Sequence, residues 1–472
     1  MLAAVGAALV LLVVYDLTQT RHAILRNFPI IGHLRYVMEA VGPELRQYIV
    51  SDNDEERPFS RDQRRWVYSI AKNENQYFGF GTDNRIDVDG YVLFRHAAFP
   101  LPPPPEPETL RCHKVLGEWR NRPAAFRPAS VVNISAMSFG SLSGPAIEAL
   151  NRGAALAGCL HNTGEGGVSD HHRQGGDLVY QCGTGYFGCR DADGKFSMSA
   201  FLDTVESAEV KAIEVKLSQG AKPGLGGVLP GAKVTKEIAE ARGVPVGITV
   251  HSPNRHSEFA DVLGLIDFVE RLADATGLPV GIKSAVGERR FWTELATRMA
   301  DDNRGPDYIA VDGGEGGTGA APLVFSDHVA LPFNTAFAQV YKEFAAVGLH
   351  RDVVFVGAGK LGFATEAMAA MTMGVDLVNV GREAMLAVGC IQAQRCHTGH
   401  CPTGVATQSR WLTRGLDPTD KAVRLGNYIA GLRGELVRLS HAMGAEHPSL
   451  VDPAAVERQS DGVLTPLLET LG

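Results

Sequence analysis

VVFVGAGKLGFATEAMAAMTMGVDLVNVG, residues 353–381, holds two short apolar runs on either side of one amphipathic segment. The runs 353–359 and 377–381 have the length and β-branched content of buried strands, and each ends in glycine. The segment between them has the apolar spacing of a helix. A strand, a helix and a second strand within about thirty residues predict a βαβ unit with parallel strands.

Similar units recur along the chain from residue 129 onward. The expected strands are 131–137, 159–164, 213–217, 246–250, 280–284, 308–313, 353–359 and 377–381. Eight such units predict an α/β fold, a closed (β/α)8 TIM barrel over residues 129–410, with its active site at the carboxyl ends of the strands. A doubly wound sheet is the alternative, although it rarely has eight regularly spaced strands. The interval 165–210 is long, and we interpret it as an insertion that forms a lid.

The first eighteen residues differ in kind from the rest. Residues 1–18 are mostly apolar, and we predict that they form a membrane anchor. The basic residues that follow, Arg21, Arg26 and Arg35, place the remainder of the chain on the cytoplasmic side. A buried helix or a signal peptide is the alternative, because the apolar stretch is short for a membrane span.

Two further segments flank the expected barrel. Residues 19–128 are interpreted as an N-terminal extension, partly helical, that packs against the barrel. Residues 411–472 are expected to form a C-terminal helical tail with a polar end. The predicted architecture is therefore a TIM barrel with an N-terminal helical extension and an anchor segment.

Composition narrows the class of protein. The net charge of −8, with no basic run, argues against nucleic acid as a partner. Hydrophobic residues make up 45% and charged residues 21%, as in ordinary soluble enzymes. Four of the seven cysteines are dispersed, which fits a reducing compartment better than a disulfide framework. The 53 glycines gather after the expected strands, where the backbone approaches a ligand closely.

The glycines after the last three strands predict a phosphate cradle. Backbone N–H groups in such turns bind phosphate in many TIM barrels, and an arginine adds positive charge. Ordinary tight turns are the alternative. The predicted cradle consists of Gly313, Gly314, Gly317, Gly357, Gly359, Gly381 and Arg382.

Charged side chains at other strand ends predict a site for a flavin and an anionic substrate. Lys283 ends the fifth expected strand, where a cation stabilises a reduced flavin anion; a structural ion pair is the alternative. Lys216, Gln219 and Lys222 share the loop after the third expected strand and suit a carboxylate-bearing substrate. Glu165, after the second strand, is a candidate acid or base.

The cysteine run C-x5-C-x4-C directly follows the last expected strand. Cys390, Cys396 and Cys401 favour an iron–sulfur cluster with three irons, because three thiolates are available and a proline follows the last. Zinc completed by His397 or His400 is one alternative, and structural thiols are another.

Several blocks, in one collinear order, resemble the FMN-binding synthase domain of glutamate synthase. They are MSFGSLSGPAIEALNRGAALAG (137–158), NTGEGG (162–167), IEVKLSQGAKPGLGGVLPGAKVTKEIAEARG (213–243), VDGGEGGTGAAPL (311–323) and GCIQAQRCHTGHCPTGVATQ (389–408). The resemblance implies an FMN-bearing TIM barrel with a 3Fe-4S cluster on the three cysteines, and electron transfer between cluster and flavin.

The same resemblance implies roles for individual residues. The flavin contacts would include Ala136, Met137, Ser138, Ser141, Gln219 and Lys283. The contacts to 2-oxoglutarate and iminoglutarate would come from Lys216, Lys222 and Arg242. Glu165, Lys222 and Lys283 would be catalytic.

This chain also departs from the family. The family loop reads KPGEGGQLPG, whereas here Leu225 and Val228 replace its acidic residue and its amide, a change that can alter specificity. A glutaminase domain is not expected, so the chain is most similar to short, membrane-anchored glutamate synthase-like proteins. We expect an FMN- and 3Fe-4S-dependent oxidoreductase that reduces an imine of 2-oxoglutarate or a related oxo-acid.

Two other functions remain open at this point. One is a membrane-linked flavin dehydrogenase that oxidises an amino or hydroxy acid, and the other is a non-catalytic electron-transfer or scaffold subunit. The expected partners are the small substrate, an electron donor or acceptor that is a protein or a quinone, the membrane, and a second copy of the chain.

Overall fold

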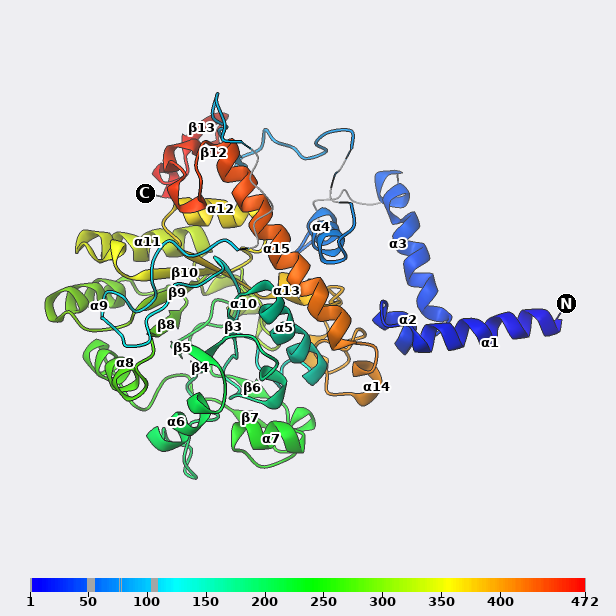
Figure 1. The fold of residues 1–472 in the computed structure, drawn as a ribbon, viewed down its shortest axis with the longest axis horizontal. Helices are drawn as coiled ribbons and strands as arrows, with labels where there is room; N and C mark the ends of the chain where they lie inside the picture. Colours follow the sequence, from blue (N-terminus) through cyan, green and yellow to red (C-terminus); the bar gives the residue numbers. More distant parts are fainter. Residues whose placement is uncertain (1, 49–55, 76, 78, 103–108, 472) are drawn as a thin grey trace.

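The computed structural model describes residues 2–48, 56–75, 77, 79–102 and 109–471 (Figure 1). Its centre is a closed parallel barrel with the strand order β10-β11-β2-β3-β4-β5-β8-β9. The barrel strands are β2 (Val132–Ile134), β3 (His161–Asn162), β4 (Leu178–Cys182), β5 (Val210–Lys216), β8 (Val280–Ser284), β9 (Tyr308–Asp312), β10 (Val354–Ala358) and β11 (Leu377–Val380). The closed ring of eight strands confirms the predicted TIM barrel.

Helices follow most of the strands and cover the barrel (Figure 1). They are α5 (Gly144–Ala157), α6 (Met198–Glu206), α7 (Lys236–Arg242), α8 (Val262–Thr276), α9 (Arg289–Asp302), α10 (Leu323–His328), α11 (Phe333–Ala346), α12 (Ala364–Thr372) and α13 (Arg382–Ala387). Local signals set their ends. The Ser143 hydroxyl accepts from the Ala146 N–H at the start of α5, and Gly158 ends α5 with a φ of 61°.

Two of the expected strand positions are wrong. The third barrel strand is β4, which lies inside the interval 165–210 that we predicted to be a lid. The expected strand 246–250 is not in the barrel, because β7 (Val250–His251) pairs only with β6 (Val228–Leu229) in a separate two-stranded sheet.

Side-chain context explains both errors. The strand β4 includes Gln181, whose amide donates to Glu214 inside the barrel at 2.6 Å, so a buried strand carries a polar residue. Conversely, Val246 and Ile248 have the composition of a buried strand but are 58% and 57% exposed. Composition alone did not separate these two cases.

Residues 110–126 of the N-terminal extension close the amino-terminal end of the barrel. Cys112 and Leu116 pack with barrel residues such as Leu160 and Tyr308 in one apolar cluster. Arg122 fixes this segment through buried ion pairs to Glu270 at 2.8 Å and to Asp307 at 3.0 Å. This end of a TIM barrel serves stability, which leaves the opposite end for chemistry.

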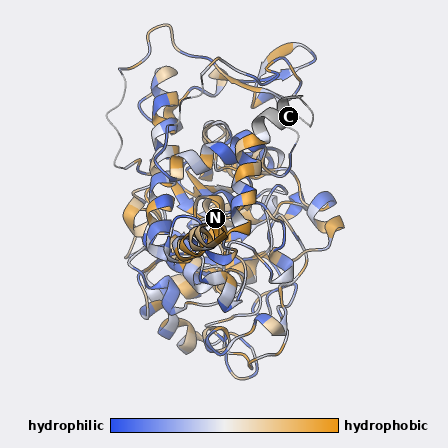
Figure 2. Ribbon diagram, turned by 90° about the vertical axis from the view of Figure 1, so that its right-hand side faces the viewer, coloured by the Kyte–Doolittle hydropathy of each residue, from blue (hydrophilic) through white to orange (hydrophobic). Residues whose placement is uncertain are grey.

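Residues 2–71 form helices at one side of the barrel (Figure 1). The predicted anchor segment forms α1 (Leu2–Thr18), and the extension forms α2 (Ala23–Asn27), α3 (Ile31–Tyr48), α4 (Arg61–Ala71) and, farther along the chain, the strand β1 (Val92–Phe94). Helices α1 and α3 stand away from the barrel, and α1 is mostly apolar (Figures 1 and 2). Among the described residues, no helix combines the length and hydropathy needed to cross a membrane.

The C-terminal segment is only partly the helical tail that we expected. It contains α14 (Arg410–Thr413) and the long helix α15 (Pro418–Ala442), which packs against α5 and α4. Beyond them, β12 (Val456–Ser460) and β13 (Val463–Pro466) form a hairpin, and β12 pairs with β1. The chain therefore ends in a small sheet shared with the N-terminal extension, and not in a polar tail.

Candidate functional site

Lys283 lies at the carboxyl end of β8 and forms a buried ion pair. Its ammonium lies 3.4 Å from the Oδ2 atom of Asp312, the last residue of β9. Burial works against the charge of Lys283, but Asp312, Glu214 and Glu165 outweigh it and raise the pKa of this lysine. The ammonium is therefore charged and held in place at the top of the barrel.

Asp312 also holds the loop that follows β5. Its Oδ2 atom accepts from the Gly220 N–H at 2.9 Å. Gly220 has to be glycine, because a Cβ there would lie 1.8 Å from the carbonyl oxygen of Gly313. We did not select Asp312 from the sequence, although an acidic residue that closes the strand YIAVD is a visible signal.

Glu165 lies among cations, as the sequence led us to expect. Its Oε1 atom is 3.1 Å from the ammonium of Lys216, which also donates to the Gln219 side chain at 2.8 Å. Burial opposes the charge of Glu165, but Lys216, Lys222 and Arg242 outweigh it and lower the pKa of the carboxyl. Glu165 is thus an ionised carboxylate near three cations, so the group has a net positive charge that suits an anionic substrate.

The turn after β2 meets the turn after β3 in the same region. Arg242 donates to the Ser138 hydroxyl at 3.3 Å and to the Phe139 carbonyl at 3.1 Å. Gly164 lies against residues 137 and 138, since a Cβ there would be 2.7 Å from the Ser138 nitrogen. Ser138 and Ser141 lie 3.0 Å apart through their hydroxyls, so the expected flavin-lining turn is ordered around Arg242.

Several of the glycines predicted to bind phosphate pack against other parts of the chain. Gly313 and Gly359 touch, because a Cβ on Gly359 would lie 3.2 Å from the Gly313 Cα, and Gly359 has a φ of 130°. The N–H groups of Gly313 and Gly314 already donate to the carbonyls of Ala358 and Leu331. Gly357 leaves room for the ring of Phe333. These positions therefore shape the loops, and not every amide is free for a ligand.

Two cations gather where β10 and β11 end. Arg382 and Lys360 lie 5.0 and 5.6 Å above the ring of Phe59. Arg382 also donates to the Glu315 carbonyl, and Gly317 makes space for its side chain. Burial lowers the pKa of both cations. Lys360 is a further candidate for binding an anionic group. The sequence analysis did not single out this lysine.

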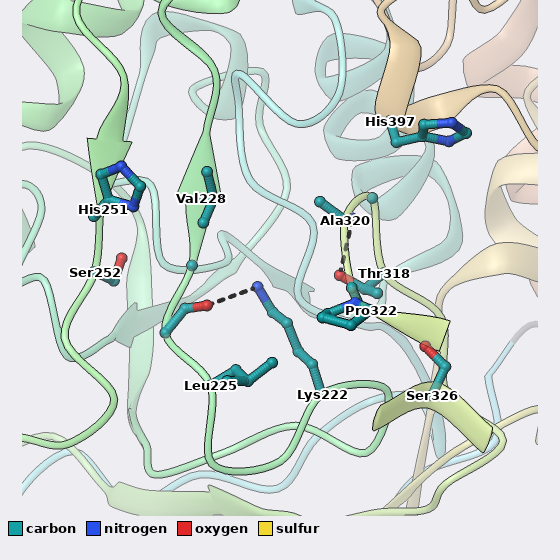
Figure 3. A pocket seen from close by; sticks show the side chains of 14 residues that line it. Lys222, Leu225, Val228, His251, Ser252, Thr318, Ala320, Pro322, Ser326 and His397 are labelled. Atoms are coloured by element: carbon teal, nitrogen blue, oxygen red, sulfur yellow. Dashed lines mark hydrogen bonds between the residues drawn. The ribbon is translucent and has the colours of Figure 1, made fainter. Parts of the chain in front are cut away.

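A cavity of about 640 Å³ opens beside Glu165 and Lys222 (Figure 3). The loop after β5 supplies Lys222 and Leu225, the start of β6 supplies Val228, and the loop after β9 faces them. Gly227 separates the cavity from the carboxylate, because a Cβ there would lie 3.1 Å from Glu165 Oε1. We did not predict Ser252 as part of this site, although it lines the cavity.

The three clustered cysteines are partly to fully buried free thiols. Burial, together with smaller contributions from Cys401 and Cys396, raises the pKa of Cys390 to about 12, so the three thiols influence one another. Lys233 donates to the Cys396 carbonyl at 2.9 Å. Within the part of the chain that the structure describes, no three His, Cys, Asp or Glu side chains are grouped so as to hold a metal ion.

The comparisons decide the family. The family model described as "Conserved region in glutamate synthase" matches residues 118–446. The chain belongs to the glutamate synthase family. The glutamate synthase large subunit-like protein YerD of Bacillus subtilis (strain 168) is 38% identical over 95% of this chain and 92% of its own length.

More distant relatives align with a smaller share of this chain. The archaeal-type glutamate synthase (NADPH) of Thermotoga neapolitana is 36% identical over 66% of this chain and 59% of its own length. This chain therefore spans 59% of the length of that protein, and the activity of that whole protein is not assigned to this chain. Among solved structures, a mandelate oxidase mutant with a monooxide FMN adduct is 14% identical, with a TM-score of 0.45 over 89% of this chain and 99% of that chain.

Proposed function

We propose that this glutamate synthase family member is an FMN- and 3Fe-4S-dependent oxidoreductase that reduces the imine of an oxo-acid to an amino acid. The observation that carries the proposal is the buried Lys283–Asp312 pair beside the cluster of Glu165, Lys216, Lys222 and Arg242. A fixed cation and an anion-binding group at one end of the barrel suit a flavin next to a carboxylate substrate.

The residues present fit FMN. Lys283 would face the flavin ring, and the turn from Ala136 to Ser141 would line it. Lys360 and Arg382, which both lie over Phe59, would neutralise the phosphate. FMN would supply a hydride to the imine carbon when bound.

The cysteine run fits an iron–sulfur cluster by its chemistry. Three thiols that influence one another, with the cation Lys233 beside them, offer a ligand set for three irons.

The side chains around the cavity suggest how the substrate is held. Ammonia adds to the oxo-acid carbonyl and water leaves, which gives the imine; a hydride to its carbon and a proton to its nitrogen then give the amine. Lys222 and Arg242 would orient the substrate carboxylate. Glu165, an ionised group bonded to Lys216, would hold the amino nitrogen or pass the proton to it.

A second candidate runs in the opposite direction, as a dehydrogenase that passes electrons to a membrane carrier. One contact favours it: the amide of Asn27 in α2 donates to the carbonyl of Pro402, next to Cys401, at 3.2 Å. The apolar helix α1 is thereby held near the proposed electron entry.

The proposal is tested on the full-length protein purified without oxygen. Flavin absorbance, about one FMN per chain and about three irons per chain are expected. The flavin is then photoreduced and mixed with ammonia and oxo-acids; reoxidation with formation of an amino acid supports the reductive reaction. A colourless protein without flavin or iron would leave only the scaffold alternative. Reoxidation by a quinone alone would favour the dehydrogenase.

A further inference from the structure

The cavity beside Glu165 has one strongly basic side chain among the described residues of its wall. Among the described residues that line it, Lys222 is the one lysine or arginine, and no aspartate or glutamate is present. Lys222 is 7% exposed, and the one hydrogen bond that its ammonium donates among the described residues goes to the Gly226 carbonyl at 3.4 Å. A buried ammonium with unused N–H groups at a cavity binds an anion such as one carboxylate.

The wall next to Lys222 is apolar. Leu225 in the same loop and Val228 at the start of β6 flank the lysine, with 38% and 48% of their surfaces exposed (Figure 3). Pro322 and Ala320 face them from the loop after β9 (Figure 3). A second carboxylate against these apolar side chains would lose water without gaining a cationic partner, whereas a hydrocarbon side chain would lose nothing.

Two hydroxyls line the cavity on the side of Pro322: the Thr318 oxygen accepts from the Ala320 N–H at 3.4 Å, and Ser326 donates to the Ala221 carbonyl at 3.2 Å. The remaining polar side chains lie elsewhere on the cavity. His251 and Ser252 lie beyond Val228 on the strand side, and His397 lies at the far side (Figure 3). Both histidines are exposed. They therefore lie away from the wall that Leu225 and Pro322 form beside Lys222.

We propose that the cavity accepts a 2-oxo or 2-amino monocarboxylic acid with an uncharged, apolar side chain. Its carboxylate binds Lys222, and its side chain packs against Leu225 and Val228. This inference rests on the proposed function and narrows its substrate from 2-oxoglutarate to monocarboxylates. As in the proposed function, the reaction consumes the oxo-acid, ammonia, a hydride and a proton, and it releases water and the amino acid.

Two oxo-acids of similar size separate the possibilities. The FMN-loaded, full-length protein is titrated with 4-methyl-2-oxopentanoate and with 2-oxoglutarate, and binding is followed by the change in oxidised flavin absorbance. Rates of flavin reoxidation with ammonia are then compared. We expect the monocarboxylate to bind at least about tenfold more tightly, since an unpaired charged group forfeits hydrogen bonds worth about that factor.

Variants locate the cause of the preference. Val228→Gln supplies an amide and is expected to improve 2-oxoglutarate binding about fivefold or more while weakening binding of the monocarboxylate. Val423→Gln on α15, where the valine is 51% exposed, is the matched control and should leave both affinities unchanged. Lys222→Gln should weaken both acids to a similar extent.

The outcomes are distinguishable. Tighter binding of 2-oxoglutarate to the unmodified holoenzyme, or an unchanged preference in Val228→Gln, overturns the inference and leaves the proposed function standing. A flavin-loaded protein that binds and reduces neither acid overturns both. A protein without flavin overturns the proposed function directly, and the inference with it.

Discussion

Asp312 is the side chain on which the candidate site depends most. One of its oxygen atoms contacts both the ammonium of Lys283 and the N–H of Gly220, so strand β8 and the loop after β5 share one carboxylate. Lys283 and Asp312 are each 7% exposed, so neither charge has water as a substitute partner. Removing one member of such a pair leaves an uncompensated buried charge.

Asp312→Asn tests this arrangement. We expect the free energy of unfolding at pH 7 to fall by about 3 kcal/mol, measured by urea unfolding. Because the pKa of Lys283 is raised, its contribution is fully present below the ordinary lysine value and is lost as the pH rises through the folded value. The difference between variant and unmodified protein should therefore shrink above about pH 10.

The same variant should change the flavin. The variant removes a negative charge and leaves the Lys283 ammonium uncompensated, which stabilises the reduced flavin anion more, so the two-electron potential should rise by about 30 mV or more, which corresponds to about 1.4 kcal/mol. Asp302→Asn at the exposed end of α9 is the matched control. An unchanged potential in Asp312→Asn would show that Lys283 does not face the flavin.

At the scale of elements, the N-terminal extension supports the cysteine run from two sides. The Tyr68 hydroxyl of α4 donates to the Cys390 carbonyl at 2.9 Å, and the Phe59 N–H donates to the Gln392 side chain at 3.1 Å. Asn27 of α2, which is 1% exposed, donates to the carbonyls of Pro402 and Leu412. The extension thus orders a loop that has little regular structure of its own.

Tyr68→Phe is expected to destabilise the loop at Cys390, the first cysteine of the run. It removes one hydrogen bond to a largely buried carbonyl, which costs about 1–2 kcal/mol of stability. We expect faster loss of iron–sulfur absorbance in air, by about fivefold. Tyr77→Phe serves as the control, because Tyr77 is 85% exposed. Equal rates for both variants would mean that α4 does not stabilise the ligand loop.

At the scale of the whole molecule, most of the surface of helix α1 contacts no other described residue. Exposed apolar residues of α1 include Leu2, Val5, Val10, Leu11 and Val14. Its one charged residue, Asp16, is buried and accepts from Ile30 N–H at 2.9 Å and bonds His33, which fixes α1 against the turn that follows. The membrane prediction from the sequence concerns this helix.

Binding to lipid vesicles checks that prediction. The full-length protein should float with vesicles that contain anionic lipids, because Arg21, Arg26 and Arg35 follow the apolar helix. Val10→Glu together with Leu11→Glu should reduce binding at least about thirtyfold, since each charge costs about 2–3 kcal/mol in lipid. If the unmodified protein stays with the vesicle-free fraction, α1 is not a membrane element.

The sequence by itself determined the barrel, because βαβ units are local patterns of apolar spacing and glycine turns. It also pointed to Glu165, Lys216, Lys222 and Lys283, since polar residues at strand ends converge on one face of any such barrel. It misplaced the third strand, because Gln181 is buried only through its bond to Glu214, a residue of the next strand. Asp312 and Lys360 acquired their roles in the same way, from partners on other strands or loops. Only the tertiary structure decided these pairings and the apolar wall around Lys222, because distances between separate loops depend on the closure of the barrel and on no local pattern.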